Sequence, residues 1–329
     1  MDFSQLMSLA SGHVEARVVQ TAVELNIFDA LQLAPLTGGE LANSLGLDPQ
    51  ASELFLNALT ALTLLHKDAG KFSLSDIAQQ FLVRGSPHYL GGMIHFDASL
   101  WRCWEMLDQS LRSGKPVRPA NMYQAEREET ETFINGMDSL VKARGDCEIL
   151  AEAIDWRNVT DLLDIGSGPA TYPIFLCRRF DQMSVTIFDL PGTLDITEKF
   201  VREAGITPRI KLIAGDYRKD PIPGSYDVIF LSNIIHGENE QKNQALIGKL
   251  AENLKPAGRI VIKDHILDQS RAYPPVGAIF SMLMLLTTDG GRCYSLEEIS
   301  AWLKSAGLAQ IEQRDLPPPL TSSLVIASR

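Results

Sequence analysis

Beyond Trp156 the chain alternates between short apolar runs and segments of helical periodicity, and this alternation restricts the fold more than any other feature. The strand-like runs are DLLDI, SVTIFD, IKLIAG, DVIFLS and RIVIKD. Because helical segments separate most of them, the pattern predicts a parallel, doubly wound α/β sheet. Two further runs, LAQIEQRDL and SSLVIAS, flank a proline-rich turn, which predicts an antiparallel hairpin that completes the sheet.

The first part of the chain has a helical pattern with one small hairpin. Apolar residues recur at helical spacing over about 11–33, Thr37 and Glu40 predict a capping box, and Asp48-Pro49 opens another helix. The segment HKDAGKFSLS has a glycine turn between apolar ends and is typical of a hairpin. Helices followed by a hairpin form the winged-helix pattern, which commonly binds DNA. The helix SELFLNALTALTLLHK has no basic residue until its end, so a dimerisation role is favoured instead.

We therefore expect a winged-helix dimerisation domain over residues 1–95, a helical connector that contributes to the active site over 96–155, and the sheet domain over 156–329. The net charge of −11 disfavours nucleic acid and anionic membranes as partners. The four cysteines lack a CxxC pair, which argues for reduced thiols and against structural zinc. With no signal-peptide pattern and no apolar run long enough to span a bilayer, a cytoplasmic location is predicted.

The run DLLDIGSGPA, residues 161–170, ends a predicted strand with a glycine-rich turn. Gly166 and Gly168 allow a sharp turn and let a ligand approach backbone amides at a helix N-terminus, although an ordinary tight turn has the same pattern. Asp164 precedes the glycines and would repel a dinucleotide pyrophosphate, and the third glycine of a nicotinamide fingerprint is absent. An acid here instead favours the cationic amino group and sulfonium of S-adenosylmethionine (SAM).

Further acids are predicted at the ends of the next two strands. Asp189 ends TIFD, where a carboxylate accepts hydrogen bonds from both hydroxyls of a ribose, the alternative being a cap of the following turn. Asp216 and Tyr217 follow the third strand, where Asp216 would receive the adenine amino group and Tyr217 would cover the ring. Three consecutive strands thus each place an acid at one edge of the sheet, and this combination predicts a SAM site.

These segments resemble the plant-type O-methyltransferase family, which includes caffeic acid and acetylserotonin O-methyltransferases and bacterial relatives. The resemblance covers nearly the whole chain, from LTGGELANSLGLDPQASELFLNAL through FINGM, DIGSGPA, FDLPG, GDY, NIIHGENE and KPAGRIVIKD to GGRCYSLEEISAWLKSAGL. It implies a winged-helix domain that forms a homodimer and a Rossmann-like class I methyltransferase domain, whose seven-stranded, mostly parallel sheet has an antiparallel C-terminal strand. It also implies SAM as donor, S-adenosylhomocysteine (SAH) as product, a small-molecule acceptor and no metal.

The resemblance further implies a general base. In that family a histidine after the fourth strand takes this role, and its place falls on His236, although a lone histidine is more often structural. The family's carboxylate after the fifth strand falls on Asp264, which would fix the imidazole tautomer. The alternative for Asp264 is a strand-end salt bridge with Lys263 or His265.

Two positions depart from the family pattern, because Gly237 and Cys293 stand where acids are usual. His236 would therefore have fewer acidic neighbours, and an acidic phenol, enol or quinol would suffer least. The cofactor is also expected to contact Leu190, Ser232 and Met137. The expected substrate pocket comprises Phe133, Asn233, Met284 and Cys293, although Met and Phe at helical spacing are ordinarily core residues.

The predicted function is SAM-dependent O-methylation of a small aromatic or polycyclic metabolite, with His236 as base. Methylation at carbon or nitrogen is the close alternative. A SAM-binding protein without methyl transfer comes next, and a DNA-binding regulator is last.

Overall fold

The computed structural model describes residues 1–329, which form two compact units. One unit comprises residues 1–100 and 135–143, and the other comprises 101–134 and 144–329. Helix α9 (Arg127–Arg144) is divided between the units, with residues 135–143 in the first unit and the rest in the second. None of the helices is both long and apolar enough to cross a membrane.

The first unit is mainly helical and carries a small antiparallel sheet in the order β1-β3-β2. In chain order, its elements are α1 (Phe3–Glu24), α2 (Ile27–Ala30), β1 (Leu36–Thr37), α3 (Gly38–Leu45), α4 (Pro49–Ala61), β2 (Leu65–Asp68), β3 (Lys71–Leu74), α5 (Asp76–Phe81) and α6 (Gly91–Ser99). The predicted hairpin is β2 and β3, and the predicted capping box is present, since Thr37 and Glu40 each bond the other's backbone N–H. Buried side chains of α1, α3, α4 and β3 form the core of this unit.

The helix predicted over 11–33 is wrong at both ends. Helix α1 begins at Phe3, because Asp2 caps it and exchanges hydrogen bonds with Gln5. It ends at Glu24, because Asn26 has a φ of 57°, in the left-handed region that interrupts a helix. The short helix α2 follows this break.

The second unit contains the predicted seven-stranded sheet, in the order β11-β12-β8-β7-β4-β5-β6. The strands are β4 (Asp161–Ile165), β5 (Ser184–Asp189), β6 (Ile210–Ala214), β7 (Tyr226–Ser232), β8 (Leu254–Asp264), β11 (Gln310–Asp315) and β12 (Ser323–Ser328). Strands β4 to β8 run parallel, whereas β12 is antiparallel to both β8 and β11, as the tail pattern predicts. The chain order reverses beside β4, where an open parallel sheet forms a crevice at the carboxyl ends of its strands.

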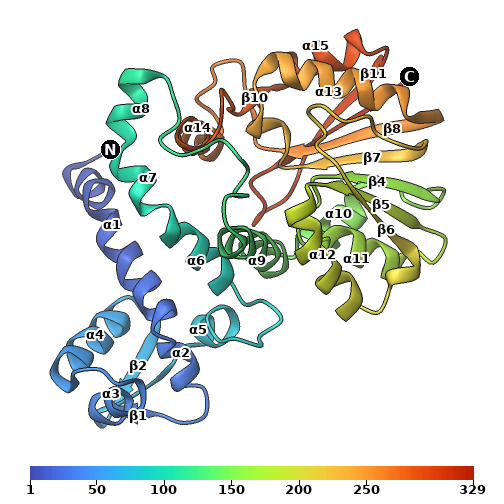
Figure 1. The fold of residues 1–329 in the computed structure, drawn as a ribbon. Coiled ribbons are helices and arrows are strands. Elements are labelled where there is room, and N and C mark those ends of the chain that lie inside the picture. Colours follow the sequence, from blue (N-terminus) through green and yellow to red (C-terminus); the bar gives the residue numbers. More distant parts are fainter. The chain divides into compact units, whose positions relative to one another are not determined.

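Helices cover both faces of this sheet (Figure 1). The helices of the unit are α7 (Trp101–Glu105), α8 (Leu107–Ser113), α10 (Asp146–Ala153), α11 (Thr171–Arg179), α12 (Pro191–Glu203), α13 (Glu240–Glu252), α14 (Pro275–Thr287) and α15 (Leu296–Ser305). Helices α13 and α15 pack on one face, where alternate residues of β4, β7, β8 and β12 form the largest cluster of buried apolar side chains. Helices α10, α11 and α12 lie on the other face.

Candidate active site

A sharp turn connects β4 to α11, at the point where the sequence predicts the cofactor. Gly166 and Gly168 have φ values of 63° and 60°, in the region that favours glycine. A Cβ atom at position 166 would lie 2.5 Å from Ile234 Cδ1 and 4.0 Å from Tyr217 Cε1. The geometry therefore requires glycine at position 166, beside the ring of Tyr217.

Two of the predicted acids meet at this turn. Asp189 Oδ2 accepts a hydrogen bond from the Gly168 N–H at 2.9 Å, and Asp164 Oδ2 accepts one from Ser167 Oγ at 2.6 Å. Burial raises the pKa of Asp164 to about 7 and that of Asp189 to about 6. The charge of Asp189 also raises the pKa of Asp164, and a bound cation would offset the cost of ionising both buried acids.

The third predicted acid is already paired. Asp216, in the turn after β6, accepts two hydrogen bonds of 2.8 Å from the Arg218 guanidinium. Burial raises the pKa of Asp216, but the hydrogen bonds and charge of Arg218 outweigh that effect and hold it below its usual range. Tyr217 turns the other way and donates its phenol hydrogen to Glu238 Oε1 at 3.2 Å.

If SAM binds at this turn, as the sequence predicts, the raised pKa values of Asp164 and Asp189 imply that its binding strengthens as the pH rises. Both acids carry protons below about pH 6 and lose them by about pH 8, and only the ionised forms attract a cation. We expect SAM affinity to be at least about tenfold lower at pH 5.5 than at pH 8. Calorimetry in buffers of different ionisation enthalpy would detect the protons released, and binding without proton release near pH 6.5 would contradict this assignment.

The same acids affect the unliganded fold in the opposite sense. Their pKa values are higher in the folded chain than in the unfolded chain, so the folded chain binds more protons between about pH 4 and pH 7. Their contribution to stability is present at low pH and is lost as the pH rises through 7.

The predicted base and its carboxylate are in contact. His236 lies in a short 3₁₀ turn (Ile235–Gly237) after β7, and its Nδ1 is 2.8 Å from Oδ1 of Asp264, which ends β8 and is 1% exposed. Burial raises the pKa of Asp264, but the His236 and His265 rings lower it further than burial raises it. When the imidazole is neutral and Nδ1–H donates to this carboxylate, Nε2 carries the lone pair.

Several uncharged side chains also lie close to His236. The Phe280 ring meets the imidazole edge-on, with centroids 4.8 Å apart. Burial, and then the charge of Asp264, raise the pKa of the Cys293 thiol to about 12, so the thiol stays protonated. At Gly237 a Cβ atom would lie 3.9 Å from both Sδ and Cε of Met122, which puts a thioether where the family has a carboxylate. Asp264 is therefore the acid that His236 contacts.

The alternative pairing of Asp264 with Lys263 is not what the structure shows. Neighbouring residues of a strand point to opposite faces of the sheet. Lys263 accordingly lies beside Asp146 of α10, with 3.1 Å between Nζ and Oδ2. The backbone N–H of His265 does donate a hydrogen bond to Asp264 Oδ1, at 2.7 Å. Asp264 therefore contacts both His236 and His265.

The remaining predicted residues are spread more widely. Met284 is buried in α14, Phe133 stacks on Tyr123 with centroids 4.6 Å apart, and Asn233, with a φ of 57°, donates its N–H to Lys263 O. Leu190 donates its N–H to Asp189 Oδ1 at 2.7 Å.

Two further cofactor contacts were predicted, Ser232 and Met137. The Oγ atom of Ser232 is buried near the Tyr172 phenol and has no hydrogen-bond partner of good geometry. Met137 belongs to the first unit. For both residues contact with the cofactor stays a prediction.

Sequence reasoning missed Glu238 and Met122. Glu238 is 3% exposed and follows the base by two residues, a spacing that could have drawn attention to it. Met122 comes from a loop distant in sequence, and no sequence signal indicates its contact with Gly237.

Comparison with known proteins decides the family. Residues 114–309 match the family described as an O-methyltransferase domain, and residues 7–84 match the O-methyltransferase dimerisation domain. The chain belongs to the O-methyltransferase family. It is a SAM-dependent methyltransferase, and the glycine-rich turn with its buried acids fits that cofactor.

Individual relatives agree with this assignment. A 3-hydroxy-5-methyl-1-naphthoate 3-O-methyltransferase of Streptomyces sahachiroi is 30% identical over 328 residues, covering 97% of this chain and 93% of the relative. An N,N-dimethyltransferase, OxyT, of Streptomyces rimosus is 26% identical over 335 residues, covering 98% of this chain and 95% of the relative. The structure of human N-acetylserotonin methyltransferase in complex with SAM superposes with a TM-score of 0.90 at 22% identity, covering 100% and 98% of the two chains, which shows the same fold.

Proposed function

We propose that this O-methyltransferase methylates a hydroxyl of a small aromatic or polycyclic metabolite, with His236 as the general base. The 2.8 Å contact between His236 Nδ1 and Asp264 Oδ1 carries the proposal, because it leaves Nε2 available to accept a proton. The relative that methylates the 3-hydroxyl of a naphthoate supports an aromatic acceptor.

The residues of this chain have separate tasks in that reaction. SAM, when bound, supplies an electrophilic methyl group. Asp164 and Asp189, at the turn that Gly166 opens, would hold its cationic end and its ribose. His236 Nε2 removes the proton of the acceptor hydroxyl as its oxygen attacks, and Asp264 stabilises the imidazolium that forms.

The uncharged surroundings of His236 favour acidic acceptors. Because Cys293 stays protonated and Met122 lies beside Gly237, only Asp264 compensates the charge of the imidazolium. A phenol or naphthol whose oxyanion is delocalised needs less help from the base than an aliphatic alcohol does.

The test uses the purified chain, methyl-labelled SAM and matched naphthalene probes: 2-naphthol, 2-naphthylamine and 2-methoxynaphthalene. We expect label in the methyl ether of 2-naphthol, at a rate that EDTA leaves unchanged. Label only in the amine, as the relationship to OxyT allows, or only on ring carbon, would replace O-methylation by the corresponding alternative. Tight SAH binding with no transfer to any probe or to a wider panel of phenols and quinols would favour a protein without methyl transfer.

We also propose that two copies of the chain pair through the N-terminal unit. The match to the dimerisation domain supports this, as do the apolar residues that α1 exposes, among them Phe3 at 79% and Leu9 at 70%. Light scattering on the full chain should then give twice the chain mass of 36.3 kDa.

A further inference from the structure

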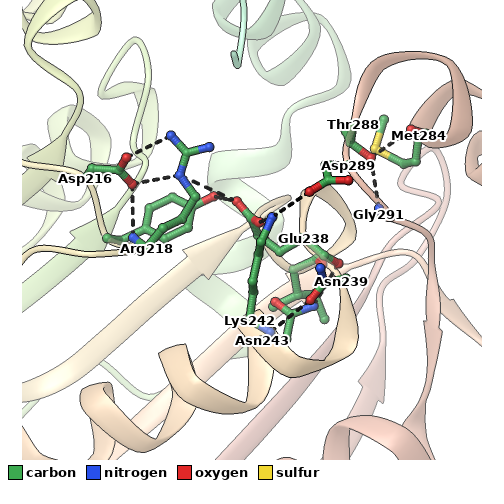
Figure 2. Close-up of polar contacts among 12 residues, drawn as sticks. Asp216, Arg218, Glu238, Asn239, Lys242, Asn243, Met284, Thr288, Asp289 and Gly291 are labelled. Atoms are coloured by element: carbon green, nitrogen blue, oxygen red, sulfur yellow. Dashed lines mark hydrogen bonds and ion pairs between the residues drawn. The ribbon is translucent and has the colours of Figure 1, made fainter. Parts of the chain in front are cut away.

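Glu238 is a buried acid that the proposed reaction does not use. It is 3% exposed, and its carboxylate accepts the phenol hydrogen of Tyr217 at 3.2 Å. Lys242 Nζ lies 3.5 Å from Oε2, and Arg218 Nε lies 4.0 Å from Oε1 (Figure 2). The carboxylate therefore joins the turn after β6 to the N-terminal end of α13.

The charge of Glu238 is compensated within a row of alternating charges (Figure 2). Arg218 also pairs with Asp216 at 2.8 Å, and Lys242 also pairs with Asp289 at 3.3 Å. A buried carboxylate is costly unless it is paired and hydrogen-bonded, and here two cations and a phenol meet that need. Glu238 is thus a paired acceptor for the Tyr217 hydroxyl.

Tyr217 is bordered both by packed side chains and by a pocket. Its ring contacts the apolar cluster that includes residues of α13, and it lies beside Gly166. A pocket of about 220 Å³ is lined by Tyr217, Arg218, Glu238, Lys242 and Lys249. Because Tyr217 borders this open space, the hydrogen bond to Glu238 helps to fix the orientation of the phenol.

The backbone of Glu238 is held independently of its side chain. Its carbonyl oxygen accepts hydrogen bonds from Tyr294 Oη at 2.6 Å and from Asn243 Nδ2 at 3.2 Å. Gly291 also packs tightly against the loop, since a Cβ atom there would lie 2.4 Å from His236 O. Removal of the carboxylate should therefore release Tyr217 without moving the loop that carries His236.

We propose that Glu238 is a positioning residue for the cofactor, which acts by holding the Tyr217 ring against the adenine side of the SAM site. This role rests on the proposed placement of SAM at the Gly166 turn. Glu238 itself touches neither donor nor acceptor, and its effect on methyl transfer runs through SAM affinity.

The test measures SAM and SAH affinity by calorimetry in the absence of acceptor. We expect Glu238→Leu to weaken binding by about tenfold to a hundredfold, the range for a lost hydrogen bond to a charged group. Glu238→Gln keeps an oxygen acceptor for the phenol and should stay within about threefold of wild type. Glu240→Leu, an exposed acid at the start of the same helix, is the matched control and should leave affinity unchanged.

A double-mutant cycle with Tyr217→Phe decides whether Glu238 acts through the phenol. If it does, the double variant should bind SAM no more than about threefold more weakly than the weaker single variant, and the KM for SAM should rise while kcat holds. Multiplying effects, or a lower Tm for Glu238→Leu with unchanged SAM affinity, would overturn the proposal in favour of a purely structural acid. If Glu238→Leu does not fold, weaker SAM binding by Tyr217→Phe supports the role and unchanged binding overturns it.

These outcomes are separate from those for the proposed function. A wild-type chain that binds SAM but methylates no probe overturns O-methylation and leaves the role of Glu238 to be judged by affinity. A wild-type chain that does not bind SAM overturns both.

Discussion

The His236→Ala variant is expected to transfer methyl groups about 10²-fold to 10⁴-fold more slowly than wild type, while it binds SAH with unchanged affinity. The proposed base would accept the proton of the acceptor hydroxyl, and its Nδ1 contacts Asp264, to which His265 donates its backbone N–H. Initial rates at saturating SAM and acceptor measure the loss, and calorimetry with SAH shows that the cofactor site is intact.

Variants of the neighbouring residues make this result specific. Asp264→Asn should lower kcat for two reasons. The amide no longer fixes the tautomer of His236 in which Nδ1 carries the hydrogen, and it lacks the charge that stabilises the imidazolium. His265→Ala is the matched control, because this second histidine also packs on Phe280 but directs its Nδ1 to Thr321 O at 3.0 Å. If His236→Ala keeps most of the activity, or if His265→Ala loses as much, then His236 is not the base. Transfer would then depend on proximity or on another nucleophile.

Much of the fold could be predicted because the positions of the strands and their parallel or antiparallel direction follow from local patterns. The apolar runs, the capping box at Thr37 and the antiparallel tail each depend on residues close in sequence. The start of β8 was missed, since KPAG resembles a turn, yet the strand begins at Leu254. There it pairs with Tyr226, next to an irregularity in the β7–β8 register. Tertiary pairing of this kind overrides local propensity.

The candidate site could be predicted only where strand ends are neighbours. Strands β7 and β8 are adjacent and parallel, so His236 and Asp264, which follow and end them, were bound to lie at one edge. Asp216 obeys the same rule in position, but Arg218, two residues further on, occupies its carboxylate. Glu238 and Met122 depend on contacts between loops, which no periodicity encodes.

The Asp146→Ala variant is expected to lose about 3 to 5 kcal/mol of unfolding free energy, the usual cost of removing one partner from a buried ion pair. Asp146 and Lys263 are both 0% exposed, and their Oδ2 and Nζ atoms are 3.1 Å apart. Asp146 also accepts two hydrogen bonds from Arg144 and one from the Tyr172 phenol. Its removal would leave the buried Lys263 ammonium without its carboxylate and near the Arg144 guanidinium.

The pH dependence of this loss identifies its cause. Burial lowers the pKa of Lys263, and the charge of Asp146 opposes that shift. Without Asp146, the pKa of Lys263 falls further, so the unfolded chain binds more protons than the folded chain. The stability of the variant therefore rises with pH. The difference in unfolding free energy between wild type and Asp146→Ala, measured by urea unfolding, should therefore be smaller at pH 9.5 than at pH 7.

The double variant Asp146→Ala/Lys263→Met tests, at a single pH, whether the unpaired Lys263 ammonium causes the loss of stability. Methionine fills a similar volume without charge, so the double variant should recover a large part of the lost stability. Asp155→Ala, which breaks an exposed pair with Arg157, is the control and should cause no measurable change. If the double variant is no more stable than Asp146→Ala, the loss comes from the Arg144 and Tyr172 hydrogen bonds, and the α9–α10 junction depends on those bonds rather than on the pair with Lys263.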